Sequence, residues 1–135
     1  MRSTGFRGKG KVQIAFRGDT ALLRIDAATT QTRRLKKLVA DFCRREVASR
    51  RPWFGPFEVH IWTSVRDDKR GAHDVDNIAK ACLDALNGVF WRDDRQVVRL
   101  TSEKFIGDVN QIAILVRPLD GAPESHELDE NLFDL

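Results

Sequence analysis

The chain has 135 residues, of which 41% are hydrophobic and 32% are charged, a composition that suits one soluble domain with a core of its own. No apolar run is long enough to cross a membrane, and the first residues lack the apolar core of a signal peptide, so we expect a cytoplasmic protein without a membrane partner. Cys43 and Cys82 belong to no C-x-x-C pair, and we expect both to be buried, reduced thiols.

The formal net charge of +3 conceals an uneven distribution. Residues 1–119 hold all 23 Lys and Arg but only 14 of the 20 acidic residues, a net charge of +9, whereas residues 120–135 carry −6. A basic body favours polyanion binding, although a solvated surface kept soluble by charge would look the same. We therefore expect one domain over residues 1–119, opening with a basic flexible arm over 1–10, and a disordered acidic tail over 120–135.

The first half of the chain predicts two strands and a helix. Residues 11–17 and 21–26 alternate like strands, and Gly18-Asp19 provides the turn of a hairpin between them. A helix follows, capped by Thr29, Thr30 or Thr32 and running to about Ser49, with a stripe of apolar residues on one face. Its outer face is rich in Lys and Arg, which suit either DNA phosphates or ordinary solvation.

Residues 57–64 alternate as a third strand, which places His60 and Trp62 on one face and makes His60 a sheet residue rather than a catalytic base. The polar loop that follows leads directly to an acidic stretch. We expect three cations of this loop to hold a DNA backbone, namely Arg66, Lys69 and Arg70.

A second helix is predicted from Ile78, because apolar residues from there to Val89 recur at helical spacing and Asn87-Gly88 provides a stop. Asp74 and Asp76 precede it on one side of an extended lead-in, where the helix dipole favours anionic oxygens. Asp93-Asp94 follows the helix and can meet Asp74 and Asp76 only if the chain reverses after Gly88 and runs back.

Clustered carboxylates usually serve a hard divalent cation, with Mg²⁺ the default and Mn²⁺ the substitute. The alternative is that Asp74 and Asp76 merely cap a helix while Asp93-Asp94 forms a solvated turn. Lys80 favours the metal, because it lies one helical turn after Asp76 on the same face.

The remaining pattern predicts a strand over residues 95–106, a turn over 107–110 and a strand over 111–117, paired as an antiparallel hairpin. The order of elements implies an α+β fold with a mixed sheet of about five strands and two main helices packed on it.

The stretch DVDNIAKACLDALNGVFWRDDRQVV closely resembles the core motif of the RusA family of Holliday junction resolvases, with the pattern D-x-D-N-x-x-K, then D-A-L, then D-D-x-Q-V-V. The resemblance implies a RusA-like fold. It also implies that Asp74, Asp76 and Asp94 bind the metal, that Lys80 is an essential catalytic lysine, and that Lys104 matches a basic position that contacts DNA.

The function that this resemblance implies is Mg²⁺-dependent cleavage of four-way DNA junctions by paired symmetric nicks, carried out by a homodimer in recombination and repair. Two alternatives remain open: a branched-DNA-binding protein without catalysis, and a less selective metal-dependent nuclease. The acidic tail is expected to contact the protein's own DNA surface or a partner protein, an expectation that rests on charge complementarity alone.

Overall fold

The computed structural model describes residues 5–6, 8, 10–28, 31–46, 54–66, 74–121, 125 and 127–134, without the side chains of residues 32, 40, 41 and 44–46. Lys69 and Arg70 therefore lie outside the described residues. The elements are β1 (Val12–Arg17), β2 (Thr20–Ile25), α1 (Thr32–Glu46), β3 (Phe57–Val65), α2 (Val75–Leu86), the 3-10 helix η2 (Asp94–Gln96), β4 (Val97–Ile106), β5 (Gln111–Pro118) and the 3-10 helix η3 (Glu130–Asp134).

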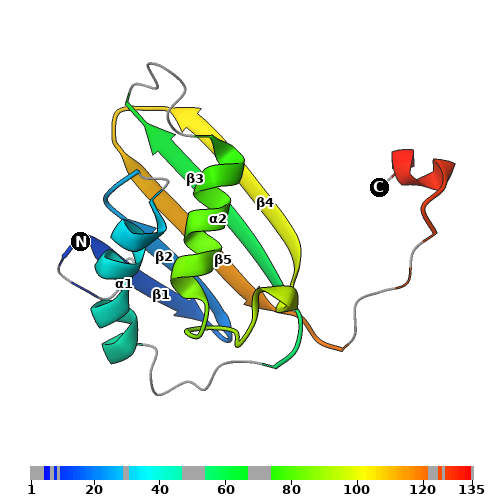
Figure 1. Ribbon diagram of the computed structural model, residues 1–135, viewed down its shortest axis with the longest axis horizontal. Coiled ribbons are helices and arrows are strands. Elements are labelled where there is room, and N and C mark those ends of the chain that lie inside the picture. The colour runs from blue at the N-terminus through cyan, green and yellow to red at the C-terminus, as the bar shows by residue number, and fades with distance from the viewer. Residues whose placement is uncertain are drawn as a thin grey trace.

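The strands form one mixed sheet in the order β1-β2-β5-β3-β4. The β1–β2 hairpin is antiparallel and turns at Gly18, whose φ of +58° suits glycine. β5 is antiparallel to both β2 and β3, whereas β4 is parallel to β3. The expected α+β architecture is confirmed, because five strands and two main helices are present (Figure 1).

The expected hairpin between the last two strands is wrong. β3 lies between β4 and β5 and pairs with both. Residues 107–110 step over the end of β3, where the Gly107 N–H donates to the Val65 carbonyl at 2.9 Å. A four-residue link extends up to about 13 Å. Crossing one intervening strand needs only about 10 Å, so a link of this length fits either topology.

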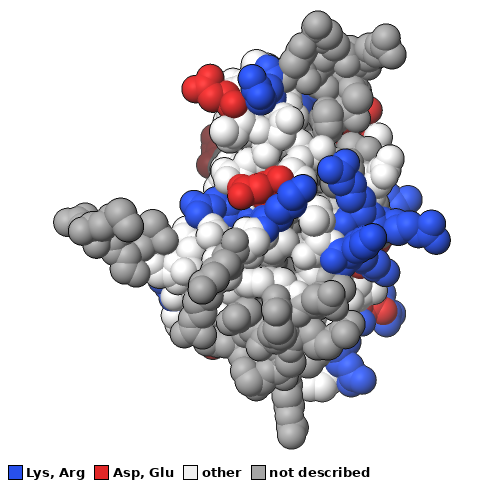
Figure 2. All heavy atoms as spheres, turned by 90° about the vertical axis from the view of Figure 1, so that its left-hand side faces the viewer, with Lys and Arg blue, Asp and Glu red and all other residues white. Residues whose placement is uncertain are grey.

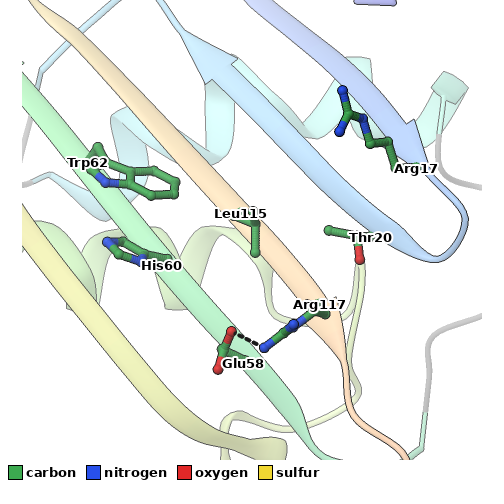
Figure 3. A pocket seen from close by; sticks show the side chains of 7 residues that line it. All are labelled: Arg17, Thr20, Glu58, His60, Trp62, Leu115 and Arg117. Carbon is green, nitrogen blue, oxygen red and sulfur yellow. Dashed lines mark hydrogen bonds and ion pairs between the residues drawn. The ribbon is translucent and has the colours of Figure 1, made fainter.

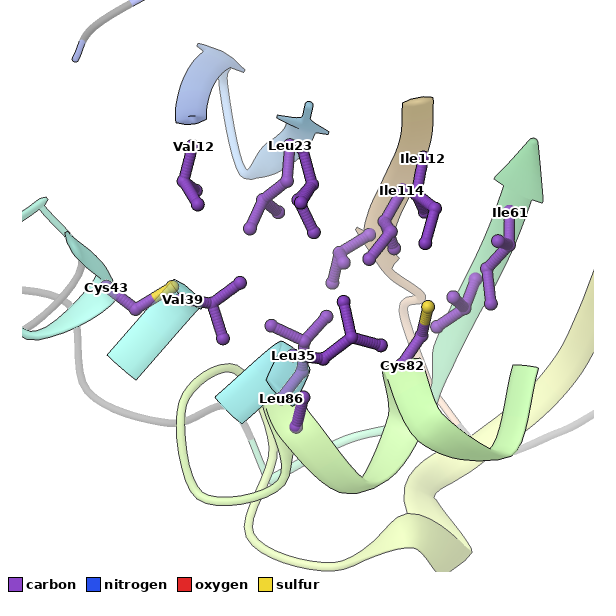
Figure 4. Close-up of a cluster of buried hydrophobic side chains, with 14 of the residues drawn as sticks. Val12, Leu23, Leu35, Val39, Cys43, Ile61, Cys82, Leu86, Ile112 and Ile114 are labelled. Atoms are coloured by element: carbon purple, nitrogen blue, oxygen red, sulfur yellow. The ribbon is translucent and has the colours of Figure 1, made fainter. Parts of the chain in front are cut away.

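Both helices pack on the same face of the sheet (Figure 1). The core lies between them and the inward side chains of the strands (Figure 4), and it includes the expected stripe residues of α1, Leu35, Val39, Phe42 and Cys43. Leu38 is partly buried against this core, and Val47 lies outside the described residues.

Trp91 anchors the connection between α2 and β4. The side chain is fully buried and meets the Phe57 ring edge-on, with ring centroids 5.5 Å apart. Gly88 turns the chain at a φ of +84°, and its N–H donates to the Trp91 carbonyl at 2.8 Å. The predicted reversal after α2 is confirmed, although residues 94–96 form the turn of η2 rather than the start of a strand.

Cys43 and Cys82 are free and buried, as expected. Burial raises the pKa of the Cys43 thiol to about 11 and that of Cys82 to about 12, because a thiolate is poorly solvated there. Within the described part of the chain, no helix combines the length and apolar character needed to span a membrane.

Candidate active site

Asp74 and Asp76 lie at the amino-terminal end of α2. Asp74 occupies the N-cap position with an extended backbone, φ −75° and ψ 140°, and its carbonyl accepts the Ile78 N–H at 2.9 Å. The expected extended lead-in is wrong for Asp76, which lies in the first helical turn, because the helix begins at Val75; both residues are exposed. This backbone arrangement follows from the sequence, because Ile78 and Ala79 turn inward and leave the preceding polar residues in solvent.

The Asp74 carboxylate does not cap the helix. Its side chain makes no capping hydrogen bond, although it occupies the position where aspartate usually does so. Among the described residues, neither Asp74 nor Asp76 is paired with a cation. The capping alternative therefore does not explain Asp74, and two carboxylates face solvent together at a helix N-terminus.

β4 lies beside this end of the helix. The Ser102 hydroxyl donates to the Val75 carbonyl at 2.9 Å, which ties the strand to the first turn of α2. Lys104 is two residues further on the same face of β4 and is in register with Thr63, near the end of β3 where Arg66 follows. Arg66 and Lys104 thus share one end of the sheet with the acidic pair.

Lys80 and Asp84 continue along α2, one and two turns after Asp76. Lys80 is exposed and Asp84 is half-buried. Lys80 makes no ion pair with either carboxylate. The lysine is therefore available to a phosphate group, because neither acidic neighbour on the helix competes for its charge.

Asp93 has a structural role that its neighbour lacks. The Asp93 Oδ1 accepts the Arg95 N–H at 2.9 Å and caps η2. Gln96 completes a capping box, because its Oε1 accepts the N–H groups of Arg92 and Asp93 at 2.8 and 3.1 Å. The backbone N–H and then the side chain of Arg95 lower the pKa of Asp93. The turn alternative is thus correct for Asp93.

Asp94 is the first residue of η2, which lies near the carboxyl end of α2 (Figure 1), whereas Asp74 occupies the N-cap position at the other end of that helix. Asp94 comes before Val97, the first residue of β4, whereas Ser102 of the same strand touches Val75. Val97 and Ser102 are about 16 Å apart at the usual rise of a strand. The chain does reverse after Gly88, but β4 itself makes the return, so Asp94 remains far from Asp74 and Asp76.

The structure therefore gathers only part of the expected acidic set. Within the residues that it describes, no group of three or more His, Cys, Asp or Glu side chains is arranged to hold one metal ion. Asp74 and Asp76 are together, and Asp94 is apart. Sequence spacing could not show this, because the distance depends on where β4 pairs in the sheet.

Basic side chains dominate the side of the molecule that carries α1 and β1, where Lys and Arg clearly outnumber Asp and Glu (Figure 2). The exposed cations on α1 include Arg33, Arg34, Lys36 and Lys37. The expected basic outer face of this helix is confirmed, and a polyanion would meet positive charge there.

A match to a known protein family shows which family this chain belongs to. The family described as Endodeoxyribonuclease RusA matches residues 9–117, which include every strand of the sheet except the last residue of β5, and both helices. The chain belongs to the RusA family. The acidic end of α2 lies within the region that the family defines.

A curated relative, the "Uncharacterized protein YqaN" of Bacillus subtilis (strain 168), is 41% identical over 44 residues. The match covers 33% of this chain and 31% of the relative, so it spans about a third of either protein. This likeness adds no function, since the relative is itself uncharacterised.

The sequence did not reveal the roles of two residues that hold the elements carrying the acidic groups. Ser102 ties β4 to α2, and the only signal is a polar residue at a strand position that faces a helix. Gln96 matched the RusA pattern, but its role emerges only from the fold, where its Nε2 also donates to the Gly55 carbonyl at 3.0 Å. Gln96, the glutamine of the D-D-x-Q pattern, thus stabilises the turn in which Asp94 lies.

Proposed function

We propose that this RusA-family chain is a structure-selective DNA endonuclease that cuts four-way junctions by Mg²⁺-dependent phosphodiester hydrolysis. The observation that carries the proposal is a pair of exposed aspartates at the start of α2, Asp74 and Asp76, with Lys80 one helical turn away. The Asp74 carboxylate makes no capping hydrogen bond. A helix N-terminus with two free carboxylates is suited to a cation that bridges protein and phosphate.

The donor set fits Mg²⁺, with Mn²⁺ as a substitute. Mg²⁺ is typically held by one or two carboxylates, while waters and substrate phosphate complete its octahedron. Asp74 and Asp76 supply such oxygens, and neither has another described cation as a competing partner. When bound, the ion would polarise the scissile phosphate and lower the pKa of the attacking water.

The cations around the carboxylates position the DNA. Lys80 offsets negative charge that builds on the phosphate or the leaving oxygen, because a fixed cation stabilises the transition state more than the ground state. Arg66 and Lys104 share this end of the sheet and hold the adjacent backbone. Lys69 and Arg70 of the loop before α2 remain predicted DNA contacts.

Asp94 requires a second copy of the chain if it is to join the same site. β4 is an edge strand, and it exposes apolar side chains, with 45% of Val98, 43% of Leu100 and 47% of Phe105 accessible. An unpaired edge with apolar side chains is a natural place for self-association. Two β4 strands placed antiparallel would bring Asp94 of each chain toward the α2 N-terminus of the other.

A mixing experiment tests this shared site. Asp76→Asn and Asp94→Asn chains are inactive alone under the proposal. A mixed dimer of the two has one intact site, because it combines the α2 end of one chain with Asp94 of the other. Random mixing should therefore restore about a quarter of the wild-type sites. Single nicks should reappear without paired cuts, whereas continued inactivity of proven mixed dimers excludes the shared site.

The substrate class is tested by comparing a synthetic four-way junction with linear duplexes of the same arm sequences, in Mg²⁺ and in Mn²⁺. The proposal predicts nicks confined to the junction. Equal cutting of the linear duplexes indicates a less selective nuclease. Tight junction binding without any cutting, in either metal, indicates a DNA-binding protein.

A further inference from the structure

The sheet face opposite the helices carries a pocket that the nuclease site does not use. Figure 3 shows this open face, with the lining side chains in front of the strands and the helices behind them. The cavity has a volume of about 340 Å³, within the usual range for small-molecule sites. It spans the sheet from Arg17 and Thr20 at the β1–β2 turn to Glu58, His60 and Trp62 on β3.

Trp62 gives the pocket an aromatic wall. The His60 ring stacks on the Trp62 indole, with centroids 3.9 Å apart and planes inclined by 14°. His60 is held in turn by Glu103 on β4, at 2.7 Å between Nε2 and Oε2. Trp62 is half-buried, and its partner across the strand is Ala113, whose side chain is only a methyl group. A flat, supported ring next to a cavity is a stacking platform for a base.

Two arginines supply positive charge at the other end of the pocket. Glu58 accepts hydrogen bonds from Arg99 at 2.8 Å and from Arg117 at 2.6 Å, which orients the Arg117 guanidinium along the pocket. Arg17 is exposed and makes no ion pair with a described carboxylate, those of η3 included. One carboxylate shared by two guanidinium groups leaves this end of the face net positive.

We propose that the open sheet face binds single-stranded DNA, with an unpaired base stacked on Trp62 and the neighbouring phosphates held by Arg17 and Arg117. Single-strand binding surfaces share an aromatic platform, a hollow beside it and nearby positive charge, and here Arg17 has no described acidic partner while Arg117 shares Glu58 with Arg99. Thr20 adds a hydroxyl that can reach a sugar or phosphate oxygen. This binding is independent of cleavage, because Asp74, Asp76 and Asp94 are not among the residues that line the pocket.

Fluorescence anisotropy of a short labelled oligothymidylate, in EDTA so that no cleavage intervenes, tests the proposal on the full chain. Trp62→Ala should weaken binding about 5- to 150-fold, and Trp62→Phe should retain most of the affinity because a ring remains. Arg17→Ala should reduce the slope of log Kobs against log salt by about 0.7 for each phosphate that the arginine neutralised. Lys11→Ala, an exposed cation before β1 that does not line the pocket, is the matched control and should leave the affinity for oligothymidylate unchanged.

The possible results distinguish single-stranded DNA from two other occupants of the open sheet face, a second chain and the acidic tail. Wild-type affinity in both Trp62→Ala and Arg17→Ala, with normal thermal unfolding, overturns the proposal. A change of dimer to monomer by light scattering in these variants also overturns it, because the face is then an interface between chains. A further variant replaces the acidic tail residues with Gln or Asn, at Glu127, Asp129, Glu130 and Asp134. If it binds oligothymidylate more tightly while Trp62→Ala has no effect, the acidic tail and not DNA occupies the face, and the proposal is overturned.

Discussion

Asp93 and Asp94 are neighbours in the sequence but have different surroundings. The Asp93 carboxylate accepts the Arg95 N–H, whereas the Asp94 carboxylate has no described partner and the residue is exposed. Cleavage should therefore survive Asp93→Asn, because asparagine also caps a helix, and should fail in Asp94→Asn, which removes a charged oxygen ligand. Junction cleavage rates of the two variants check this. An equal loss of cleavage in both variants would mean that cleavage depends on the η2 cap and would contradict a specific role for the Asp94 carboxylate.

Substitution of Lys80 should affect the cleavage rate but not the affinity for the junction. Lys80 is exposed, makes no ion pair with Asp76 or Asp84, and lies one helical turn after Asp76 on α2. Lys80→Ala should lower the cleavage rate roughly 10² to 10³ fold, the usual effect of removing a preorganised electrostatic stabiliser. Junction affinity should change little, as measured by gel shift. Lys36→Ala on α1 is the control, and an equal rate loss there would contradict a specific role for Lys80.

At the scale of elements, the connection between α2 and β4 depends on Trp91. Its side chain is fully buried against Phe57, so Trp91→Ala removes a large apolar surface and leaves a cavity. The free energy of unfolding should fall by about 3 to 5 kcal/mol, measured by urea denaturation. Trp91→Phe should be less destabilising. A loss below about 1 kcal/mol in Trp91→Ala would show that this packing does not hold the turn.

The open face of the sheet offers a test of pH dependence. The hydrogen bond from Arg99, followed by the charge of Arg117, lowers the pKa of Glu58, against an opposing effect of partial burial. Since the folded pKa lies below the unfolded one, this stabilisation is complete above the ordinary carboxyl pKa and is lost as pH falls through the lowered value. The melting temperature of wild type should exceed that of Glu58→Gln at neutral pH, and the difference should vanish in acid. A constant difference would contradict the ion pair.

Local patterns predicted most of these elements. Alternation in VQIAFR and FEVHIWTS and the helical spacing from Ile78 to Leu86 each depend on a face that is buried, so burial and periodicity agree. The β4–β5 pairing failed for a physical reason, because a four-residue link allows both a hairpin and a step over β3. A further signal was present in composition. β5 reads QIAILVRP and is central, whereas β4 carries Arg99, Glu103 and Lys104 and is an edge.

The candidate site was predictable in its residues but not in its layout. Asp74, Asp76 and Lys80 depend only on one helix, so their common location follows from local geometry. The position of Asp94 depends on the parallel pairing of β3 and β4, which is a property of the whole sheet. The separation of the acidic residues is therefore a consequence of topology that no local spacing could reveal.

For the molecule as a whole, charge and active site are divided between regions. The body of the chain is strongly basic, the acidic pair interrupts this charge at one end of α2, and the acidic tail follows β5. The expectation that the tail is disordered stays a prediction, and its described residues include the short helix η3 with Leu128 and Phe133 exposed. A negative patch within a positive surface opposes DNA binding unless a cation neutralises it.

The most direct measurement is cleavage and binding of a four-way junction by Asp76→Asn in Mg²⁺, beside wild type and Asp19→Asn. Asp19 is an exposed residue of the β1–β2 turn and controls for the loss of one negative charge. We expect Asp76→Asn to lose cleavage while binding the junction at least as tightly as wild type, because a charge that repels phosphate is gone. Cleavage at the wild-type rate by Asp76→Asn would contradict the assignment of the α2 N-terminus as the active site.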